Sequence, residues 1–247
     1  MNFSAISETS LLGKVLRWPL RLLPASLRVP ILQGRLRGKL WIVGAGTHGY
    51  WLGSYESQKQ AVFEKHIHLG NVVFDIGAHT GYYSLIASTL VGSRGKVFAF
   101  EPLPRNIHFL NEHLRINRIT NVQVINSAVS DRNGTAHFSD KGSSFQGRLT
   151  VDGDIEVNVV CLDDLWKQAE LPAPDVIKLD VEGAEFAVLL GAERLIRTAR
   201  PVIFLATHGV EVQHQCEVWL QTSGYKLSSL NSPDEILALP DGEKHIR

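Results

Sequence analysis

Residues 71–85 combine acids, glycines and an apolar run at a spacing that suits the binding of a small molecule. Residues 72–76 form a short β-branched and aromatic run, which is typical of a central parallel strand covered on both faces. Gly77 and Gly81 follow, and glycines allow positive φ angles and a close approach of the backbone to a ligand. The helix expected after this loop would turn its N-terminal amides toward that ligand. The stretch therefore predicts a strand, a loop and a helix around a small-molecule site.

Two acids indicate the charge of the ligand. Asp75 lies at the end of this strand, and Glu101 follows the next expected strand, residues 96–100. A carboxylate at that position suits the paired hydroxyls of a ribose. A dinucleotide site normally has the pattern G-x-G-x-x-G for its pyrophosphate, whereas this loop has His79 at the middle glycine position. Because carboxylates attract cations and repel phosphates, we expect a cationic nucleoside, and S-adenosylmethionine has that chemistry.

A second glycine-rich stretch, Gly44–Gly49, also follows an apolar run and has the full G-x-G-x-x-G pattern. A dinucleotide unit would continue with a crossover helix, a second strand and an acid about 20 residues further on. Here Tyr50–Gly53 interrupts the pattern, and Glu64 lies in a helical stretch rather than at a strand end. An NAD(P)-dependent oxidoreductase that uses Gly44–Gly49 is therefore kept as an alternative. We expect four nearby side chains at the mouth of the main site, on the substrate side: Trp41, His48, Tyr50 and Trp51.

Strands and helices must alternate regularly to position these residues. From residue 53 onward, the pattern predicts a helix opened by Glu56, strands over 72–76, 96–100, 122–126, 175–180 and 201–206, helices over 81–91, 104–117, 183–197 and 211–223, and an antiparallel pair of strands over 226–229 and 235–239. This alternation predicts a seven-stranded, mostly parallel sheet with helices on both faces, a Rossmann-like α/β fold. Residues 131–160 predict an inserted β-hairpin, whose glycine- and serine-rich tip could bring Ser143–Gln146 to a substrate.

An excess of basic residues distinguishes the N-terminal segment from the rest of the chain. We expect a basic amphipathic extension or cap over 1–52, the catalytic domain over 53–240 and a short tail over 241–247. Residues 1–40 contain seven basic residues against Glu8 alone, and leucines alternate with arginines there. This segment could contact an anionic membrane surface through residues 11–39, contact an acidic or lipid-linked substrate, or pack its leucines on the domain.

The overall composition narrows the class of protein. The 25 basic residues balance the 25 acidic ones, which argues against a nucleic-acid partner. The two cysteines form no metal-binding spacing, and no apolar run is long enough to cross a membrane. The first residues also lack the pattern of a signal peptide. These features predict a cytoplasmic protein, peripheral at the inner membrane surface if its basic segment binds lipid.

Five motifs occur along the chain in a fixed order: Tyr55-Glu56, Asp75–Tyr83, Phe100–Pro102, Leu162–Leu165 and Ile177–Glu185. With this ordered set, residues 53–229 resemble the FkbM family of S-adenosylmethionine-dependent methyltransferases. The resemblance implies a class I methyltransferase fold and transfer of a methyl group to a hydroxyl of a sugar, glycolipid or secondary metabolite. A catalytically silent, membrane-associated binding protein of the same fold is a further alternative.

The resemblance also implies which residues hold the cofactor. It assigns the methionine half to the loop after the first parallel strand, the ribose to Glu101 and the adenine to the segment after the third strand. The residues expected to bind S-adenosylmethionine are Glu56, Asp75, Gly77, Ala78, His79, Gly81, Tyr82, Glu101, Pro102, Ser127, Ala128 and Asp180.

Methyl transfer to oxygen is an in-line displacement in which the acceptor hydroxyl must be held in position and lose its proton. His208, just after the fifth parallel strand, is the candidate general base, with Asp180 as the alternative. Lys178, Asp180 and Glu182 alternate along the fourth strand and its exit, so they face one side and could orient the hydroxyl. The family often has a glutamate before this histidine. This chain has Ala206-Thr207 instead, so we expect no acid–histidine pair from that position.

We expect no metal. Catechol-type methyltransferases hold magnesium with an aspartate after the fourth strand and an Asp-Asn pair after the fifth. Only Asp180 has a counterpart in this chain.

Overall fold

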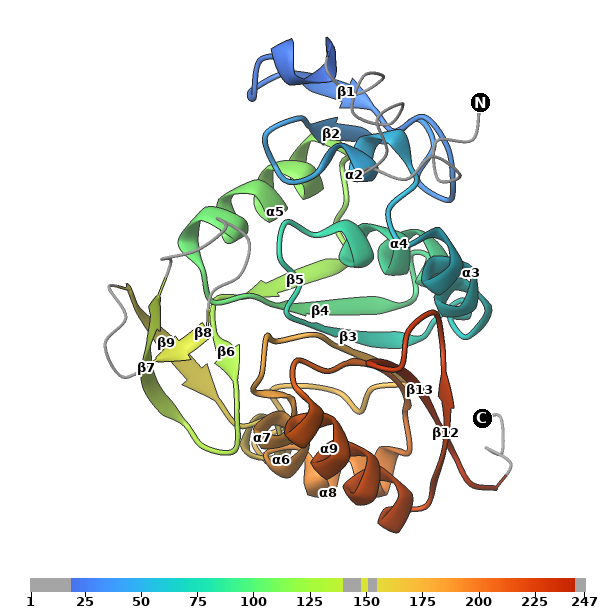
Figure 1. Ribbon diagram of the computed structural model, residues 1–247, viewed down its shortest axis with the longest axis vertical. Coiled ribbons are helices and arrows are strands. Elements are labelled where there is room, and N and C mark those ends of the chain that lie inside the picture. Colours follow the sequence, from blue (N-terminus) through green and yellow to red (C-terminus); the bar gives the residue numbers. More distant parts are fainter. Residues whose placement is uncertain (1–18, 140–147, 151–154, 243–247) are drawn as a thin grey trace.

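A computed structural model describes residues 19–139, 148–150 and 155–242 (Figure 1). The expected substrate-contacting tip, Ser143–Gln146, lies outside the described residues, as do residues 1–18 of the basic extension and 243–247 of the tail.

The central sheet contains seven strands in the order β12-β13-β11-β10-β3-β4-β5. Its bounds are β3 (Val72–Ile76), β4 (Lys96–Phe100), β5 (Val122–Ile125), β10 (Val176–Leu179), β11 (Val202–Ala206), β12 (Tyr225–Ser229) and β13 (Glu235–Pro240). The first five of these strands run parallel, and β13 pairs antiparallel with β11 and with β12. The predicted fold class is confirmed. The carboxyl ends of β3, β4 and β10 meet at one edge because these strands are parallel neighbours.

Helices cover both faces of the sheet (Figure 1). One face carries α3 (Ser57–Lys65), α4 (Tyr82–Val91) and α5 (Pro104–Ile116), and the other carries α6 (Leu162–Lys167), α7 (Glu185–Leu190), α8 (Glu193–Ala199) and α9 (Val210–Thr222). Each set packs on its own apolar cluster. The single helix predicted over 183–197 is wrong, because the structure has two helices, α7 and α8. They meet at Gly191, which packs so tightly on the carbonyl of Ser130 that no Cβ would fit.

The insertion is larger than the predicted β-hairpin. It is a four-stranded sheet in the order β6-β9-β7-β8, with β6 (Ala128–Val129), β7 (Gly134–Ser139), β8 (Arg148–Thr150) and β9 (Ile155–Val160). β9 pairs antiparallel with β7 on one side and parallel with β6 on the other. Phe138, Val157 and Val159 form a small apolar cluster with Leu103, at the start of α5. The hairpin is therefore fixed to the main domain through β6 and this cluster.

The N-terminal region begins with a 3₁₀ turn, η2 (Pro19–Leu22), and forms a two-stranded antiparallel sheet of β1 (Arg28–Pro30) and β2 (Leu40–Ile42), followed by the short helix α2 (His48–Leu52). Gly44–Gly49 thus follows a strand outside the central sheet and lacks the parallel βαβ unit of a dinucleotide site. This finding removes the structural basis for the NAD(P) alternative. Among the described residues, no helix has the length and apolar character needed to cross a membrane.

His113 of α5 attaches this N-terminal sheet to the glycine-rich loop. Its Nε2 accepts a hydrogen bond from the amide of Ile42 at 3.1 Å, and its Nδ1 donates to the carbonyl of Thr80 at 2.8 Å. The Trp41 ring stacks on the imidazole at a centroid distance of 3.7 Å. His113 and Trp41 are both fully buried. The N-terminal sheet is therefore fixed to the glycine-rich loop, and the segment after it, with Gly46, Thr47 and Tyr50, reaches the cavity wall.

Candidate active site

A cavity of about 460 Å³ opens beyond the carboxyl ends of β3, β4 and β10. Its volume lies within the usual range for a small-molecule site. The residues predicted from the sequence that line it are Gly77, Ala78, His79, Tyr82, Glu101, Pro102, Ser127, Ala128, Lys178, Asp180 and Glu182. The cavity therefore unites most of the expected cofactor residues with three of the four expected catalytic ones.

The glycine-rich loop follows β3 and forms the floor of the cavity. The amides of Gly77 and Ala78 both donate to the carbonyl of Phe100, at 3.0 and 2.9 Å. Gly77 has a φ of +78°, and a Cβ at this position would overlap the carbonyl oxygen of Asp180. His79 also adopts a left-handed conformation, with φ at +52°. Only glycine fits at position 77, because the loop packs directly against the Asp180 carbonyl.

Glu101 lies at the end of β4 and is 5% exposed. Its Oε2 accepts a hydrogen bond from the amide of His79 at 2.8 Å. Its Oε1 accepts from the amide of Leu103 at 3.0 Å and from the side chain of Asn106 at 3.1 Å. Burial raises the pKa of Glu101, and these hydrogen bonds oppose that rise. Each carboxylate oxygen can accept more than one hydrogen bond, so the fixed carboxylate can also receive the hydroxyls of a ribose.

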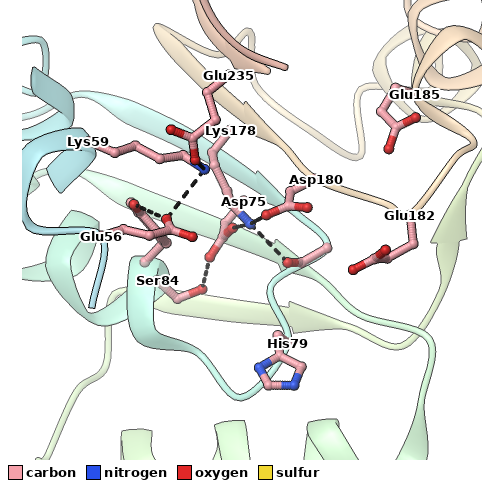
Figure 2. Close-up of polar contacts among 12 residues, drawn as sticks. Glu56, Lys59, Asp75, His79, Ser84, Lys178, Asp180, Glu182, Glu185 and Glu235 are labelled. Carbon is pink, nitrogen blue, oxygen red and sulfur yellow. Dashed lines mark hydrogen bonds and ion pairs between the residues drawn. The ribbon is translucent and has the colours of Figure 1, made fainter. Parts of the chain in front are cut away.

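Asp75 does not reach the cavity, contrary to the expectation of direct cofactor contact. It is fully buried, and its Oδ2 accepts a hydrogen bond from Ser84 at 2.5 Å. The Nζ of Lys178 lies 3.6 Å from Asp75 Oδ1 and 3.4 Å from Asp180 Oδ2, and donates to the carbonyl of Gly77 at 3.1 Å (Figure 2). Lys178 thus links Gly77, in the loop that forms the floor of the cavity, to Asp180 on the cavity wall. The two carboxylates that flank it are Asp75 and Asp180, rather than Asp180 and Glu182.

Two other expected cofactor residues also support the site from outside the cavity lining. Glu56, just before α3, accepts a hydrogen bond from the hydroxyl of Tyr83 at 2.7 Å and lies 3.3 Å from Lys59. The ammonium of Lys59 also lies 3.0 Å from Glu235 (Figure 2). Gly81 packs against Leu110 of α5, where a Cβ would overlap the leucine side chain. Glu56 and Gly81 therefore hold the glycine-rich loop and α4 in place.

His208 lies beside the cavity, next to two acids that line it. Its Nε2 is 3.4 Å from Glu182 Oε2 and 3.8 Å from Asp180 Oδ1. Its Nδ1 lies 2.8 Å from Oε1 of Glu185, a fully buried residue at the start of α7. The acid–histidine pair that we did not expect from Ala206-Thr207 therefore comes from Glu185 instead. The sequence contained one signal for it, since Glu185 ends the Ile177–Glu185 motif.

The surrounding charges shift the pKa values of His208 and Asp180. The hydrogen bond that His208 donates to Glu185 and the nearby carboxylates raise the pKa of His208, although partial burial opposes the rise. Burial tends to raise the pKa of Asp180, but Lys178 and other cations hold it below its usual value. A raised pKa favours the imidazolium form, which cannot accept a proton, and a lowered pKa makes a carboxylate a weaker base. Neither expected base is tuned for the role by its neighbours alone.

Several residues of the cavity wall were not predicted from the sequence, or were predicted only in part. Tyr50 was expected near the mouth and does line the cavity, whereas Trp41, His48 and Trp51 do not belong to the lining described. Tyr50 packs on Tyr55 and Tyr82, with ring centroids 4.4 and 5.0 Å apart. The missed lining residues include Gly46, Thr47, Tyr55, Leu103, Asn106 and Phe138. The glycine pattern of Gly44–Gly49 marked this N-terminal segment, but only tertiary packing decides which of its residues reach the cavity.

The sheet order, the glycine-rich loop and the acid after β4 together define a class I methyltransferase. The Methyltransferase FkbM domain matches residues 75–239, which is more than half of the chain. The chain therefore belongs to the FkbM family of S-adenosylmethionine-dependent methyltransferases.

Named relatives and a solved structure are consistent with this assignment. The hexuronic acid methyltransferase AglP of Haloferax volcanii is 28% identical over 144 residues, which are 57% of this chain and 58% of that protein. The 2-O-methyltransferase NoeI of Sinorhizobium fredii is 28% identical over 149 residues, which are 52% of this chain and 60% of that protein. The crystal structure of a methyltransferase FkbM from Methylobacillus flagellatus superposes with a TM-score of 0.54 at 17% identity, covering 77% of this chain and 52% of that one. The matched regions thus span about three fifths of the two named relatives.

The residues of the cavity fit S-adenosylmethionine, the cofactor of this family. Glu101 offers a buried carboxylate at the ribose position, and the loop backbone at Gly77 packs directly on the Asp180 carbonyl, where no Cβ would fit. Ser127 and Ala128 line the cavity after β5, where the adenine was expected. The acids of the opposite wall, Asp180 and Glu182, suit a ligand with a positive charge.

Proposed function

We propose that the protein transfers the methyl group of S-adenosylmethionine to a hydroxyl of a sugar, either free or part of a glycolipid or secondary metabolite. One observation carries the proposal. A single cavity has the fixed carboxylate of Glu101 on one wall and the acids Asp180 and Glu182, with His208 beside them, on another. AglP is a methyltransferase of hexuronic acid, which supports a sugar acceptor, and NoeI is a 2-O-methyltransferase, which supports transfer to oxygen.

The bound cofactor supplies an electrophilic methyl group on a sulfonium. The cavity residues would hold the acceptor oxygen in line with that methyl group, and the electron pair of the carbon–sulfur bond would stay on sulfur. The acceptor hydroxyl must lose its proton in the same process. We assign this proton loss to the side of the cavity formed by Asp180, Glu182 and His208, since no other wall combines these residue types among the described residues.

Lys178 has a positioning role in this proposal. Burial tends to lower its pKa, but Asp180 and Asp75 hold that pKa above its usual value, so the ammonium stays charged. It fixes Asp180 on one side and the Gly77 carbonyl on the other. The loop that holds the cofactor and the acid that faces the acceptor are thereby kept at a constant separation.

The N-terminal wall is proposed to contact the acceptor. Gly46, Thr47 and Tyr50 line the cavity from outside the central sheet, and Tyr55 adds a further aromatic side chain. Aromatic rings present apolar faces with polar edges, which suits the faces and hydroxyls of a sugar ring. Contact of residues 11–39 with a membrane stays a prediction. Within that range, Arg28 and Arg35 pair with Glu112 and Glu64 of the domain, at 3.6 and 2.9 Å.

The test has two parts. Isothermal titration of the purified protein should show binding of S-adenosylhomocysteine and no binding of NAD. Incubation with methyl-labelled S-adenosylmethionine and a panel of hexuronic acids, neutral sugars and glycolipids should then label at least one acceptor. Binding of NAD without S-adenosylhomocysteine would instead support an oxidoreductase. Cofactor binding without labelling of any hydroxylated acceptor would support a catalytically silent binding protein.

A further inference from the structure

Asp180, Glu182 and His208 bring three metal-ligating side chains together. One ligand atom from each, two carboxylate oxygens and an imidazole nitrogen, lie within 4.8 Å of one another. The side chains are 26%, 24% and 27% exposed, so the cluster can be reached from solvent but is not a free surface. Cis ligands of a six-coordinate cation lie about 3 Å apart, given metal–ligand bonds of about 2.1 Å. Small rotations of these side chains would reach that spacing.

Glu185 provides an independent observation. It lies outside the cluster and is 0% exposed, and its Oε1 accepts hydrogen bonds from the Gly183 amide at 2.9 Å and from His208 Nδ1 at 2.8 Å. Its Oε2 is buried and accepts no hydrogen bond from any described residue. With Nδ1 bound to this carboxylate, the Nε2 of His208 is directed at Glu182 and Asp180. A buried carboxylate that orients a histidine in this way is the usual outer partner of a metal ligand.

We infer that Asp180, Glu182 and His208 bind one divalent cation of the Mn²⁺ or Mg²⁺ type at the acceptor side of the cavity. Two carboxylates and one imidazole leave further coordination positions for water and for a hydroxyl of the acceptor. A hydroxyl bound to the cation is more acidic, so its proton passes to a solvent base instead of to His208. This inference rests on the proposed function for its catalytic role, but the binding of the cation does not.

The position of the cluster explains why the sequence did not predict it. Catechol-type methyltransferases have acidic ligands after the fifth strand, where this chain has Ala206-Thr207-His208. The structure supplies an imidazole there and adds Glu182 from the loop after β10. The left-handed conformation of Glu182, with φ at +57°, belongs to that loop. Glu182, three residues after the end of β10, has no counterpart in the catechol-type pattern.

Mn²⁺ is the probe for the test, because it can be followed both by electron paramagnetic resonance and by isothermal titration. The full chain, freed of metal and saturated with S-adenosylhomocysteine, should bind one Mn²⁺. Glu182→Gln and His208→Gln should each weaken that binding at least about tenfold, and Glu185→Gln should weaken it about tenfold through the orientation of His208. Glu193→Gln alters an exposed acid of α8 and should leave the affinity unchanged.

Three results would overturn the inference: no saturable Mn²⁺ binding by a folded protein, affinity unchanged in both ligand variants, or complete loss of Mn²⁺ binding when S-adenosylhomocysteine is added. The last would show that the acids bind the cofactor's ammonium. Melting curves of each variant report whether it is folded. Methyl transfer that proceeds fully in the presence of a chelator would refute the metal and leave the proposed function intact. Mn²⁺ binding without methyl transfer would refute the function and leave the metal site intact.

Discussion

The carboxylate of Glu101 and the backbone amide of His79 form a 2.8 Å hydrogen bond that joins the end of β4 to the glycine-rich loop. The bond fixes the acid beside the loop, on the cavity wall. Two consequences can be measured, one for the binding of the cofactor and one for the loop itself.

Glu101→Gln should weaken the binding of S-adenosylhomocysteine by about 10- to 100-fold. The variant replaces charge-assisted hydrogen bonds to the ribose hydroxyls with weaker neutral ones, a loss of about 1.5–3 kcal/mol. Isothermal titration measures the effect. Glu112→Gln, which changes an acid of α5 outside the cavity lining, serves as the control. An unchanged dissociation constant in a folded Glu101→Gln protein would contradict the assignment of Glu101 to the ribose.

Gly77→Ala should abolish cofactor binding and lower the melting temperature. The left-handed conformation costs an alanine about 1–2 kcal/mol, and its Cβ would also overlap the carbonyl oxygen of Asp180. Gly70→Ala is a matched control, because Gly70 has a φ of +85° but open space around its Cα. Gly70→Ala should show only the conformational cost and retain cofactor binding. Equal behaviour of the two variants would show that packing on Asp180 is unimportant.

His208→Ala should lower turnover by at least about 100-fold while changing the affinity for S-adenosylhomocysteine by less than about twofold. The reason is its position beside Asp180 and Glu182, outside the residues that line the cofactor cavity. Single-turnover methyl transfer and titration separate the two effects. His214→Ala, on the exposed side of α9, is the control. Turnover that persists in His208→Ala would remove this residue from the mechanism.

Thr47→Arg should raise the KM for the acceptor about tenfold and leave cofactor affinity unchanged. Thr47 is exposed and lines the cavity from the N-terminal wall, so a longer side chain there would occupy acceptor space. A tenfold change corresponds to about 1.4 kcal/mol of binding free energy. Thr120→Arg, an exposed position outside the cavity lining, is the control. If cofactor affinity falls and acceptor KM does not change, the N-terminal wall belongs to the cofactor side.

The free energy of unfolding should fall as the pH is lowered from about 6.5 to about 4, partly because of His113. Burial lowers the pKa of His113 to about 4 from an ordinary value of 6.5. In that window the unfolded chain binds a proton that the folded protein does not, so acid favours unfolding by up to about 1.4 kcal/mol per pH unit. Urea denaturation between pH 5 and 7 measures the slope.

His113→Gln should therefore unfold with a smaller pH dependence than the native protein, although it is less stable at neutral pH. His214→Gln alters an exposed histidine and should retain the native slope. If His113→Gln and the native protein show identical slopes, His113 is not the buried neutral group described above.

Local patterns in the sequence were sufficient for the central sheet and the cofactor loop. Val72–Ile76 and Lys96–Phe100 form the two strands with the bounds expected, because buried parallel strands are short apolar runs that end at the ligand. Gly77 and Glu101 follow those strands directly, so their place at one sheet edge could be inferred from the order of elements alone. The role of Asp75 could not, since its burial against Ser84 and Lys178 depends on α4 and β10.

Contacts between distant parts of the chain decided the remainder of the site. The pairing of Glu185 with His208, the inclusion of Thr47 and Tyr50 in the cavity wall and the four-stranded insertion all join segments that no sequence period relates. The sequence by itself determined the fold class and the glycine-rich loop of the cofactor site, because these follow from periodicity and from the conformational freedom of glycine. Only the tertiary structure determined the acid–histidine cluster, because it forms where the loop after β10, the start of α7 and the end of β11 pack together.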